Sequence, residues 1–146
     1  MNKSPVLILY VEDDPAHAEI AFRSLEKFKE INKIVHVTDG QLALDYLYRQ
    51  GEYANQLKCP RPDLILLDLR LPKVDGIEVM RKVRTDEELR SIPIVILTTS
   101  VAERDIARAY MNNVNSYLVK PLEENKFTEL FESLGYYWLV WNTYPN

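Results

Sequence analysis

The sequence has 146 residues, enough for one domain of ordinary size, and we expect a single domain over residues 1–146. A composition that is 47% hydrophobic and 27% charged excludes a disordered chain. The net charge of -4 argues against nucleic-acid binding, which needs a basic surface to neutralise phosphates.

The first apolar run, Val6 to Val11, ends in the acids Glu12, Asp13 and Asp14. It is too short for a signal-peptide core or a membrane span. The single cysteine, Cys59, permits no intrachain disulfide and indicates a reducing compartment. We therefore expect a cytoplasmic protein that does not associate with a membrane.

Short apolar runs rich in β-branched residues alternate with longer amphipathic stretches along the chain. The runs, expected to be buried strands, are Val6 to Val11, Ile34 to Val37, Leu64 to Leu69, Ile94 to Thr98 and Tyr117 to Val119. The stretches expected to be helices are 15–28, 41–49, 77–84, 102–111 and one that begins near 123. This alternation predicts an α/β fold with a parallel sheet and helices on both of its faces.

Two segments lie outside the alternation. Residues 51–62 are expected to form a longer loop, and residues from about 135 to 146 an aromatic C-terminal extension. The aromatic residues from the last helix onward are Phe127, Phe131, Tyr136, Tyr137, Trp138, Trp141 and Tyr144. One helix of a small domain rarely buries so many aromatic rings, and exposed ones mark interfaces. The C-terminal region therefore predicts a homodimer.

Polar side chains follow the predicted strands at their carboxyl ends, where open α/β sheets bind ligands. Glu12 and Asp13 follow the first strand, and the third strand runs through Leu66 and Leu67 into Asp68. Carboxylates in one crevice repel each other unless a cation lies among them, and their oxygens suit Mg²⁺. Thr98 ends the fourth strand and Lys120 follows the fifth. A carboxylate, a metal, a hydroxyl and a lysine are the groups needed to transfer a phosphoryl group to Asp68.

Each of these residues also has an ordinary structural interpretation. Asp13 and Asp14 could cap the first helix, and Thr98 could be a simple strand-end hydroxyl. Lys120 could be an ion-pair partner of Asp13 or Asp68. Their joint placement at the strand ends favours the phosphoryl-acceptor interpretation.

Four segments of the chain resemble the response-regulator receiver family, in the family's order and over nearly the whole length. They are LILYVEDDP, PDLILLDLRLPKVDGIEV, IPIVILTTS and SYLVKP. The resemblance implies a flavodoxin-like, doubly wound sheet of order 2-1-3-4-5 with five helices. It also implies a stand-alone response regulator of a two-component phosphorelay that signals through a phosphorylation-dependent surface change. Such a protein catalyses its own phosphorylation and dephosphorylation, without turnover of an external substrate.

The resemblance also assigns roles at the metal site. Asp68 matches the phosphoacceptor, which receives its phosphoryl group from a histidine kinase. Asp13 matches the direct Mg²⁺ ligand, Glu12 a ligand that acts through water, and the backbone carbonyl of Arg70 a further ligand. The Arg70 side chain is a departure, because the family often has a smaller or neutral residue there. We therefore expect altered autodephosphorylation.

The remaining roles concern the phosphoryl group and the switch. Lys120 matches the lysine that pairs with the phosphoryl group, Thr98 the switch hydroxyl, and Tyr117 the aromatic residue that moves with it. Within the family, GEY before PRPDLILLDL and a C-terminal YWL resemble the small regulators paired with bacterial phytochromes. The implied partner is then a light-sensing or similar sensor kinase.

Three other functions compete with this interpretation. A phosphatase of the haloacid dehalogenase class would use Asp68 as a transient nucleophile, but it needs a second acid where Arg70 stands. A flavin-binding module needs a phosphate loop after the first strand, where residues 12–14 are all acidic. The main alternative is a receiver-like protein-interaction module that works without phosphorylation.

Overall fold

A computed structural model describes residues 6–26, 32–54, 59–98 and 116–119, together with Asn125 and Glu129. Its parallel strands are β1 (Val6–Val11), β2 (Asn32–Val37), β3 (Leu64–Asp68), β4 (Ile94–Thr98) and β5 (Ser116–Val119). They form one sheet in the order β2-β1-β3-β4-β5, which confirms the predicted topology.

The described helices are α1 (Pro15–Leu25), α2 (Gly40–Tyr48) and α3 (Gly76–Thr85), with a short 3-10 turn η2 (Gly51–Tyr53) at the start of the predicted long loop. Helix α1 ends at Leu25 rather than near residue 28. The helix expected at 102–111 lies outside the described residues. Of the last predicted helix, only Asn125 and Glu129 are described, and both are helical and exposed.

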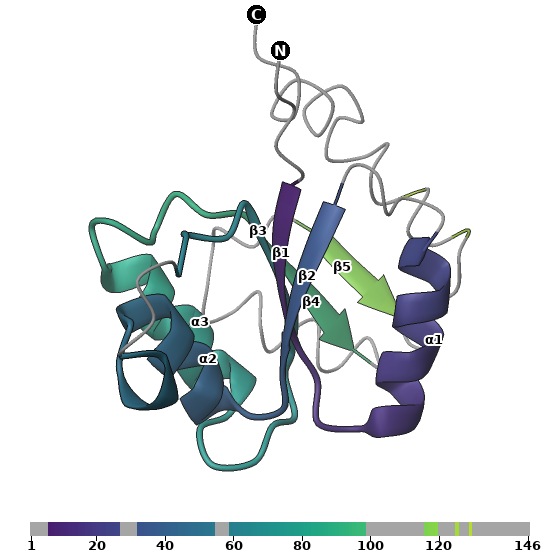
Figure 1. The fold of residues 1–146 in the computed structure, drawn as a ribbon, viewed down its shortest axis with the longest axis horizontal. Coiled ribbons are helices and arrows are strands. Elements are labelled where there is room, and N and C mark those ends of the chain that lie inside the picture. Colours follow the sequence, from purple (N-terminus) through teal and green to yellow (C-terminus); the bar gives the residue numbers. More distant parts are fainter. Residues whose placement is uncertain are drawn as a thin grey trace, which may run out of the picture.

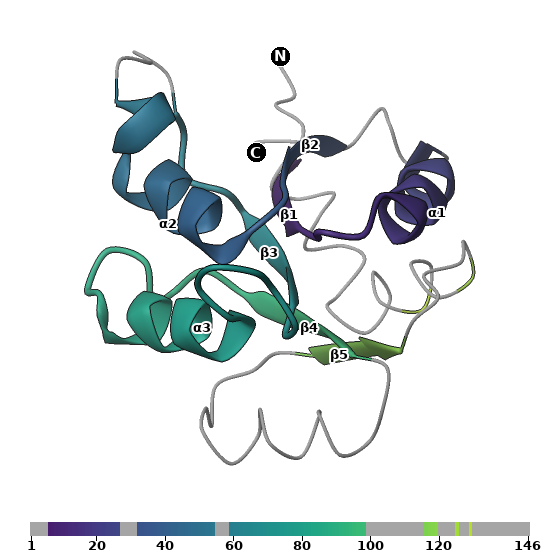
Figure 2. The same ribbon diagram turned by 90° about the horizontal axis from the view of Figure 1, so that it is seen from below.

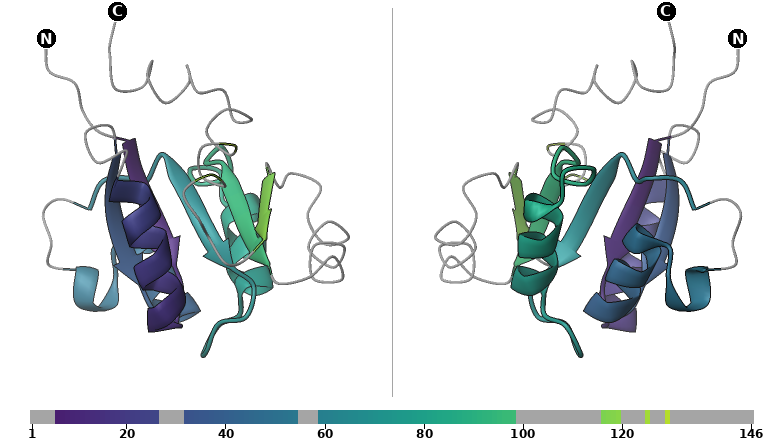
Figure 3. Two further views of the ribbon diagram at one scale, coloured as in Figure 1. Left: turned by 90° about the vertical axis from the view of Figure 1, so that its right-hand side faces the viewer. Right: turned by 90° about the vertical axis from the view of Figure 1, so that its left-hand side faces the viewer.

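Helix α1 covers one face of the sheet, and α2 and α3 cover the other (Figures 1 and 2). The two side views of Figure 3 show the same layers, with α1 in front in one view and α2 and α3 in front in the other. Each face has its own apolar cluster of fully buried side chains, around Ile8 and Leu66 under α1 and around Leu9 and Leu67 under α2 and α3. Strand β3 is buried along its whole length because helices cover both of its faces.

The loops that follow β1, β2 and β3 leave the sheet at one edge, at the bottom of Figure 1. Each leads into a helix whose first turn is capped by an aspartate, namely Asp14, Asp39 and Asp75. A capping carboxylate accepts hydrogen bonds from backbone N–H groups that have no partner within the helix. The carboxyl edge of the sheet therefore carries three helix N-termini as well as the ends of the strands.

The loop between β3 and α3 packs closely against its surroundings. A Cβ atom on Gly76 would lie 2.3 Å from the backbone oxygen of Asp68, and one on Gly40 would lie 1.7 Å from that of Val74. Lys73 in this loop has a φ of 68° and places Nζ 3.6 Å from an Asp39 carboxylate oxygen. The fold thus fixes the chain that follows Asp68 against the start of α2 and of α3.

Candidate functional site

The register of the sheet places Glu12 beside Asp68. Strands β1 and β3 pair in parallel, with Val11 opposite Leu67. Glu12 directly follows β1, and Asp68 is the last residue of β3. They therefore reach the carboxyl edge side by side, as the sequence predicted from the strand ends.

Asp13 joins these two residues in one acidic cluster. One carboxylate oxygen from each of Glu12, Asp13 and Asp68 lies within 4.8 Å of the other two. Glu12 is fully buried, Asp68 is 6% exposed, and Asp13 is exposed. Two oxygens on opposite sides of a Mg²⁺ ion are about 4 Å apart, so small side-chain movements would bring this set onto one ion. The donors are all carboxylate oxygens, which suits a hard divalent cation.

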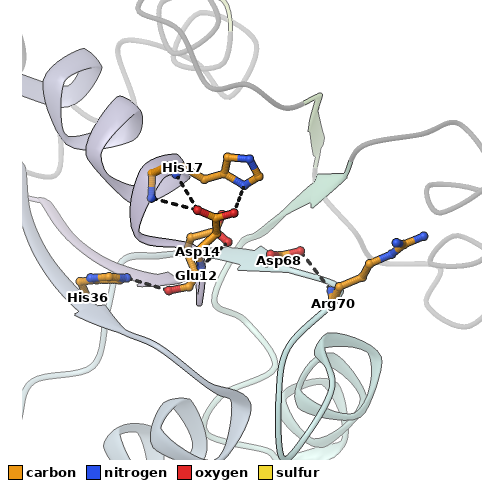
Figure 4. A network of polar contacts seen from close by, with 7 residues as sticks. Glu12, Asp14, His17, His36, Asp68 and Arg70 are labelled. Atoms are coloured by element: carbon orange, nitrogen blue, oxygen red, sulfur yellow. Dashed lines mark hydrogen bonds and ion pairs between the residues drawn. The ribbon is translucent and has the colours of Figure 1, made fainter.

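Short hydrogen-bonded contacts hold the turns around the cluster (Figure 4). The backbone N–H of Arg70 donates to Oδ1 of Asp68 at 3.0 Å, and that of Asp14 donates to Oε2 of Glu12 at 3.3 Å. The Arg70 side chain is exposed and extends away from Asp68 in Figure 4. The altered autodephosphorylation expected from the Arg70 side chain therefore remains a prediction.

Asp14 has the structural role that the sequence left open for it. Its Oδ1 accepts hydrogen bonds from the backbone N–H groups of Ala16 at 2.9 Å and His17 at 3.3 Å. This is the pattern of an N-cap followed by proline at the start of a helix. Asp13, by contrast, lines a pocket outside the sheet edge, so the two neighbouring acids have different roles.

The pocket beside Asp13 has a volume of about 480 Å³. Its other lining residues come from the β3–α3 loop and the start of α3, and they are Leu69, Arg70, Leu71, Pro72, Asp75 and Ile77. A reactant that enters this pocket would meet the exposed member of the acidic cluster first.

Tyr10 is a neighbour of the cluster that sequence reasoning missed. It is fully buried in β1, and burial raises the pKa of its phenol far above the usual value. The carboxylates of Glu12 and Asp68 raise that pKa further, because they would repel a phenolate. Tyr10 therefore stays neutral beside the acids.

Three predicted site residues are described only in part or not at all. Thr98 ends β4 one residue after Leu97, which pairs with Asp68, so its backbone lies at the same edge of the sheet. The backbone of Tyr117 in β5 pairs with that of Ile96 in β4. Nothing is described of either side chain, and Lys120 lies outside the described residues. Their roles remain predictions.

Within the described residues, no helix has both the length and the apolar character to cross a membrane.

Comparison with known proteins gives a consistent set of matches. A family model, the response regulator receiver domain, matches residues 8–132. The probable methanogenesis regulatory protein FilR2 of Methanothrix harundinacea is 45% identical over 143 residues, which cover 98% of this chain and 90% of that protein.

Two solved structures are similar over most of the chain. The bacteriophytochrome response regulator RtBRR has a TM-score of 0.83 and 44% identity, covering 90% of this chain and 79% of that one. The Mn²⁺-bound form of response regulator Rcp1, a protein of Synechocystis, has a TM-score of 0.75 and 37% identity, covering 97% of this chain and 100% of that one.

Proposed function

Because this chain belongs to the response regulator receiver domain family, we propose that Asp68 accepts a phosphoryl group with the help of Mg²⁺. The chain is a receiver of phosphorylation-dependent two-component signalling, the function that its family serves. Receiver domains bind a divalent metal ion, and a solved relative holds Mn²⁺. The assignment of Mg²⁺ and of individual residues is our proposal.

The meeting of three carboxylates at the carboxyl edge of the sheet is the observation that carries this proposal. Oxygens of Glu12, Asp13 and Asp68 within 4.8 Å of one another repel strongly without a cation. The β1–β3 register fixes two of these residues, so the fold maintains the arrangement despite its electrostatic cost. A metal ion would relieve the repulsion and attract a phosphorylated donor to the same place.

Asp68 would act as the nucleophile. A carboxylate oxygen attacks the phosphorus atom of the donor, the bond from phosphorus to the leaving group breaks, and an acyl phosphate remains on Asp68. When bound, Mg²⁺ would neutralise negative charge on the phosphoryl oxygens. Asp13 and Asp68 would be direct ligands, and Glu12 would act through water. The backbone carbonyl of Arg70 would be the remaining protein ligand.

Lys120 and Thr98 would take part in the transfer, and Thr98 and Tyr117 would form the switch that follows it. The ammonium of Lys120 would pair with the phosphoryl group, and the Thr98 hydroxyl would contact it. Tyr117 would follow Thr98 and change the surface around β5, which shifts the population toward the active state. Support comes from the family resemblance and from the backbone positions of Thr98 and Tyr117 on neighbouring paired strands.

The test uses the full chain, Mg²⁺ and acetyl phosphate as a small phosphodonor. Intact-mass measurement should show one added phosphoryl group on the wild type, and none when Mg²⁺ is removed with a chelator. Asp68→Asn, which is close in size but lacks the nucleophilic carboxylate, should gain none.

Two outcomes would argue against this function. Equal phosphorylation of wild type and Asp68→Asn would place the acceptor elsewhere. No phosphorylation of a wild type that demonstrably binds Mg²⁺ would support the alternative of a phosphorylation-independent interaction module.

The proposed partner is a sensor histidine kinase in the cytoplasm. The 44% identity to RtBRR, whose name identifies it as a bacteriophytochrome response regulator, makes a phytochrome-type kinase the first candidate to assay. A single, buried cysteine suits a reducing compartment. A homodimer formed by the C-terminal region is the remaining part of the proposal and concerns residues outside those described.

A further inference from the structure

The imidazole of His36 is held in one orientation beside the acidic cluster. His36 lies opposite Tyr10 in the β1–β2 register, and the two rings stack with centroids 5.3 Å apart and an interplanar angle of 28°. Phe22 of α1 packs edge-on against both rings, at 5.3 Å from His36 and 5.9 Å from Tyr10. These contacts limit the directions in which the ring nitrogens of His36 can point.

One ring nitrogen of His36 contacts the backbone of Glu12. Nε2 lies 2.9 Å from the Glu12 carbonyl oxygen (Figure 4). A carbonyl oxygen can only accept a hydrogen bond, so Nε2 carries the hydrogen and donates it. The backbone N–H of Glu12 donates to the carbonyl of Val37 at 3.1 Å. Residues of β2 therefore fix both backbone polar groups of Glu12.

The Glu12 carbonyl belongs to the peptide group that leads into Asp13. A peptide group is planar, so a contact that limits rotation of its carbonyl group also limits where the Asp13 Cα atom can lie. Asp13 is the exposed member of the acidic cluster and lies two residues after Val11, the last residue of β1 that is paired in the sheet. The contact with His36 therefore helps to hold the turn that carries Asp13.

We infer that His36 is a positioning residue for the metal site, which orients the Glu12–Asp13 peptide so that Asp13 is ready to bind the cation. The inference rests on the proposed function, because it concerns the metal that phosphorylation at Asp68 requires. It predicts that removing the N–H donor weakens metal binding even when the aromatic packing is kept. Groups that orient ligands from outside typically change metal affinity by about 10- to 100-fold.

The test measures Mn²⁺ binding to the full chain, from the electron paramagnetic resonance signal of free Mn²⁺ during a titration. His36→Phe keeps a stacked ring but removes the donor, and it should bind Mn²⁺ roughly tenfold more weakly than wild type. His36→Gln should restore most of the affinity, because its amide nitrogen can reach the place of Nε2. Tyr48→Leu is the control, since Tyr48 is 40% exposed on α2 and the ring contacts of His36 are with Tyr10 and Phe22, and it should bind Mn²⁺ as the wild type does.

The outcomes separate this inference from the proposed function. Wild-type affinity in His36→Phe, or failure of His36→Gln to restore binding, would overturn the inference alone, provided that urea unfolding shows the variants to be folded. A wild type that binds Mn²⁺ no better than Asp13→Asn would overturn the proposed metal site and the inference with it.

Discussion

At the scale of single residues, the three carboxylates of the cluster lie in different environments although they are close together. Glu12 has no exposed surface, Asp68 has 6%, and Asp13 is exposed beside the pocket. Removing a carboxylate from water costs free energy, which the neighbouring N–H donors of Asp14 and Arg70 offset in part. Asp13 stays accessible, so it is the group through which a cation would enter.

Tyr10 gives a prediction about stability at high pH. Burial and the adjacent acids raise the pKa of its phenol in the folded chain, while the unfolded chain keeps the usual value of about 10. Above that pH the unfolded chain releases a proton that the folded chain keeps, so the free energy of unfolding falls as pH rises. A single such group contributes a slope of up to about 1.4 kcal/mol per pH unit, and its stabilisation is fully present below pH of about 10.

Urea unfolding at several pH values between about 9 and 11 checks this expectation. Tyr10→Phe should lose stability less steeply with pH than wild type. Tyr48→Phe is the control, because Tyr48 is 40% exposed and its pKa is raised mainly by modest burial. Equal slopes for wild type and Tyr10→Phe would show that Tyr10 titrates normally.

At the scale of elements, the β3–α3 loop packs closely against the backbone of Asp68, the proposed acceptor. It leaves β3 at Asp68, and the N–H of Gly76 donates to the Leu69 carbonyl at 3.0 Å, where α3 begins. Side-chain atoms at Gly76 would meet backbone atoms of Asp68 and Leu69, which cannot move independently of the sheet. The backbone at Asp68 and the start of α3 are thus packed as one unit.

Gly76→Ala tests this packing. The added Cβ would lie 2.3 Å from the Asp68 oxygen, so the loop must shift, at a cost of about 1–3 kcal/mol. We expect lower stability in urea and slower phosphorylation by acetyl phosphate. Ala16→Ser, an exposed change near the start of α1, is the control and should alter neither quantity. A Gly76→Ala variant with wild-type stability and rate would show that the loop tolerates the shift.

Much of this architecture could be predicted from local sequence signals. Leu64 to Asp68 has the continuous apolar pattern of a strand covered on both faces, and Asp14-Pro15 marks a helix start. The position of the acids at the carboxyl edge could also be predicted, because the end of each strand can be recognised from the residues around it. The contacts of His36 and Tyr10 depend on the register between β1 and β2 and on the packing of α1, which no short stretch of sequence contains.

At the scale of the whole molecule, the sheet separates two apolar clusters and brings the chemistry to one edge (Figures 1 and 2). Strand β2 is at one edge of the described sheet and β5 is at the other. The proposed metal site lies at the ends of β1 and β3, whereas the proposed switch residues Thr98 and Tyr117 belong to β4 and β5. The effect of phosphorylation at Asp68 would therefore pass from β3 to β4 and then to β5, which are consecutive strands of a single sheet.

The C-terminal aromatic residues give a prediction about assembly. If the C-terminal region forms a homodimer, the full chain should sediment as a dimer at micromolar concentration. The double variant Trp138→Ala/Trp141→Ala should shift toward monomer, because large aromatic side chains dominate interface energies. Tyr48→Ala, which removes an exposed aromatic residue elsewhere, should remain dimeric. A monomeric wild type, or a dimer unaffected by loss of both tryptophans, would contradict the proposed interface.

The central claim is that Asp68 carries the phosphoryl group, and locating the modified residue tests it most directly. The chain is phosphorylated with acetyl phosphate and Mg²⁺, then treated with borohydride, which reduces an acyl phosphate to an alcohol and so marks the acceptor permanently. Peptide mass spectrometry should find homoserine in place of Asp68 and unchanged aspartate at positions 13 and 14. Homoserine at another position, or none in a chain that has gained a phosphoryl group, would contradict the assignment.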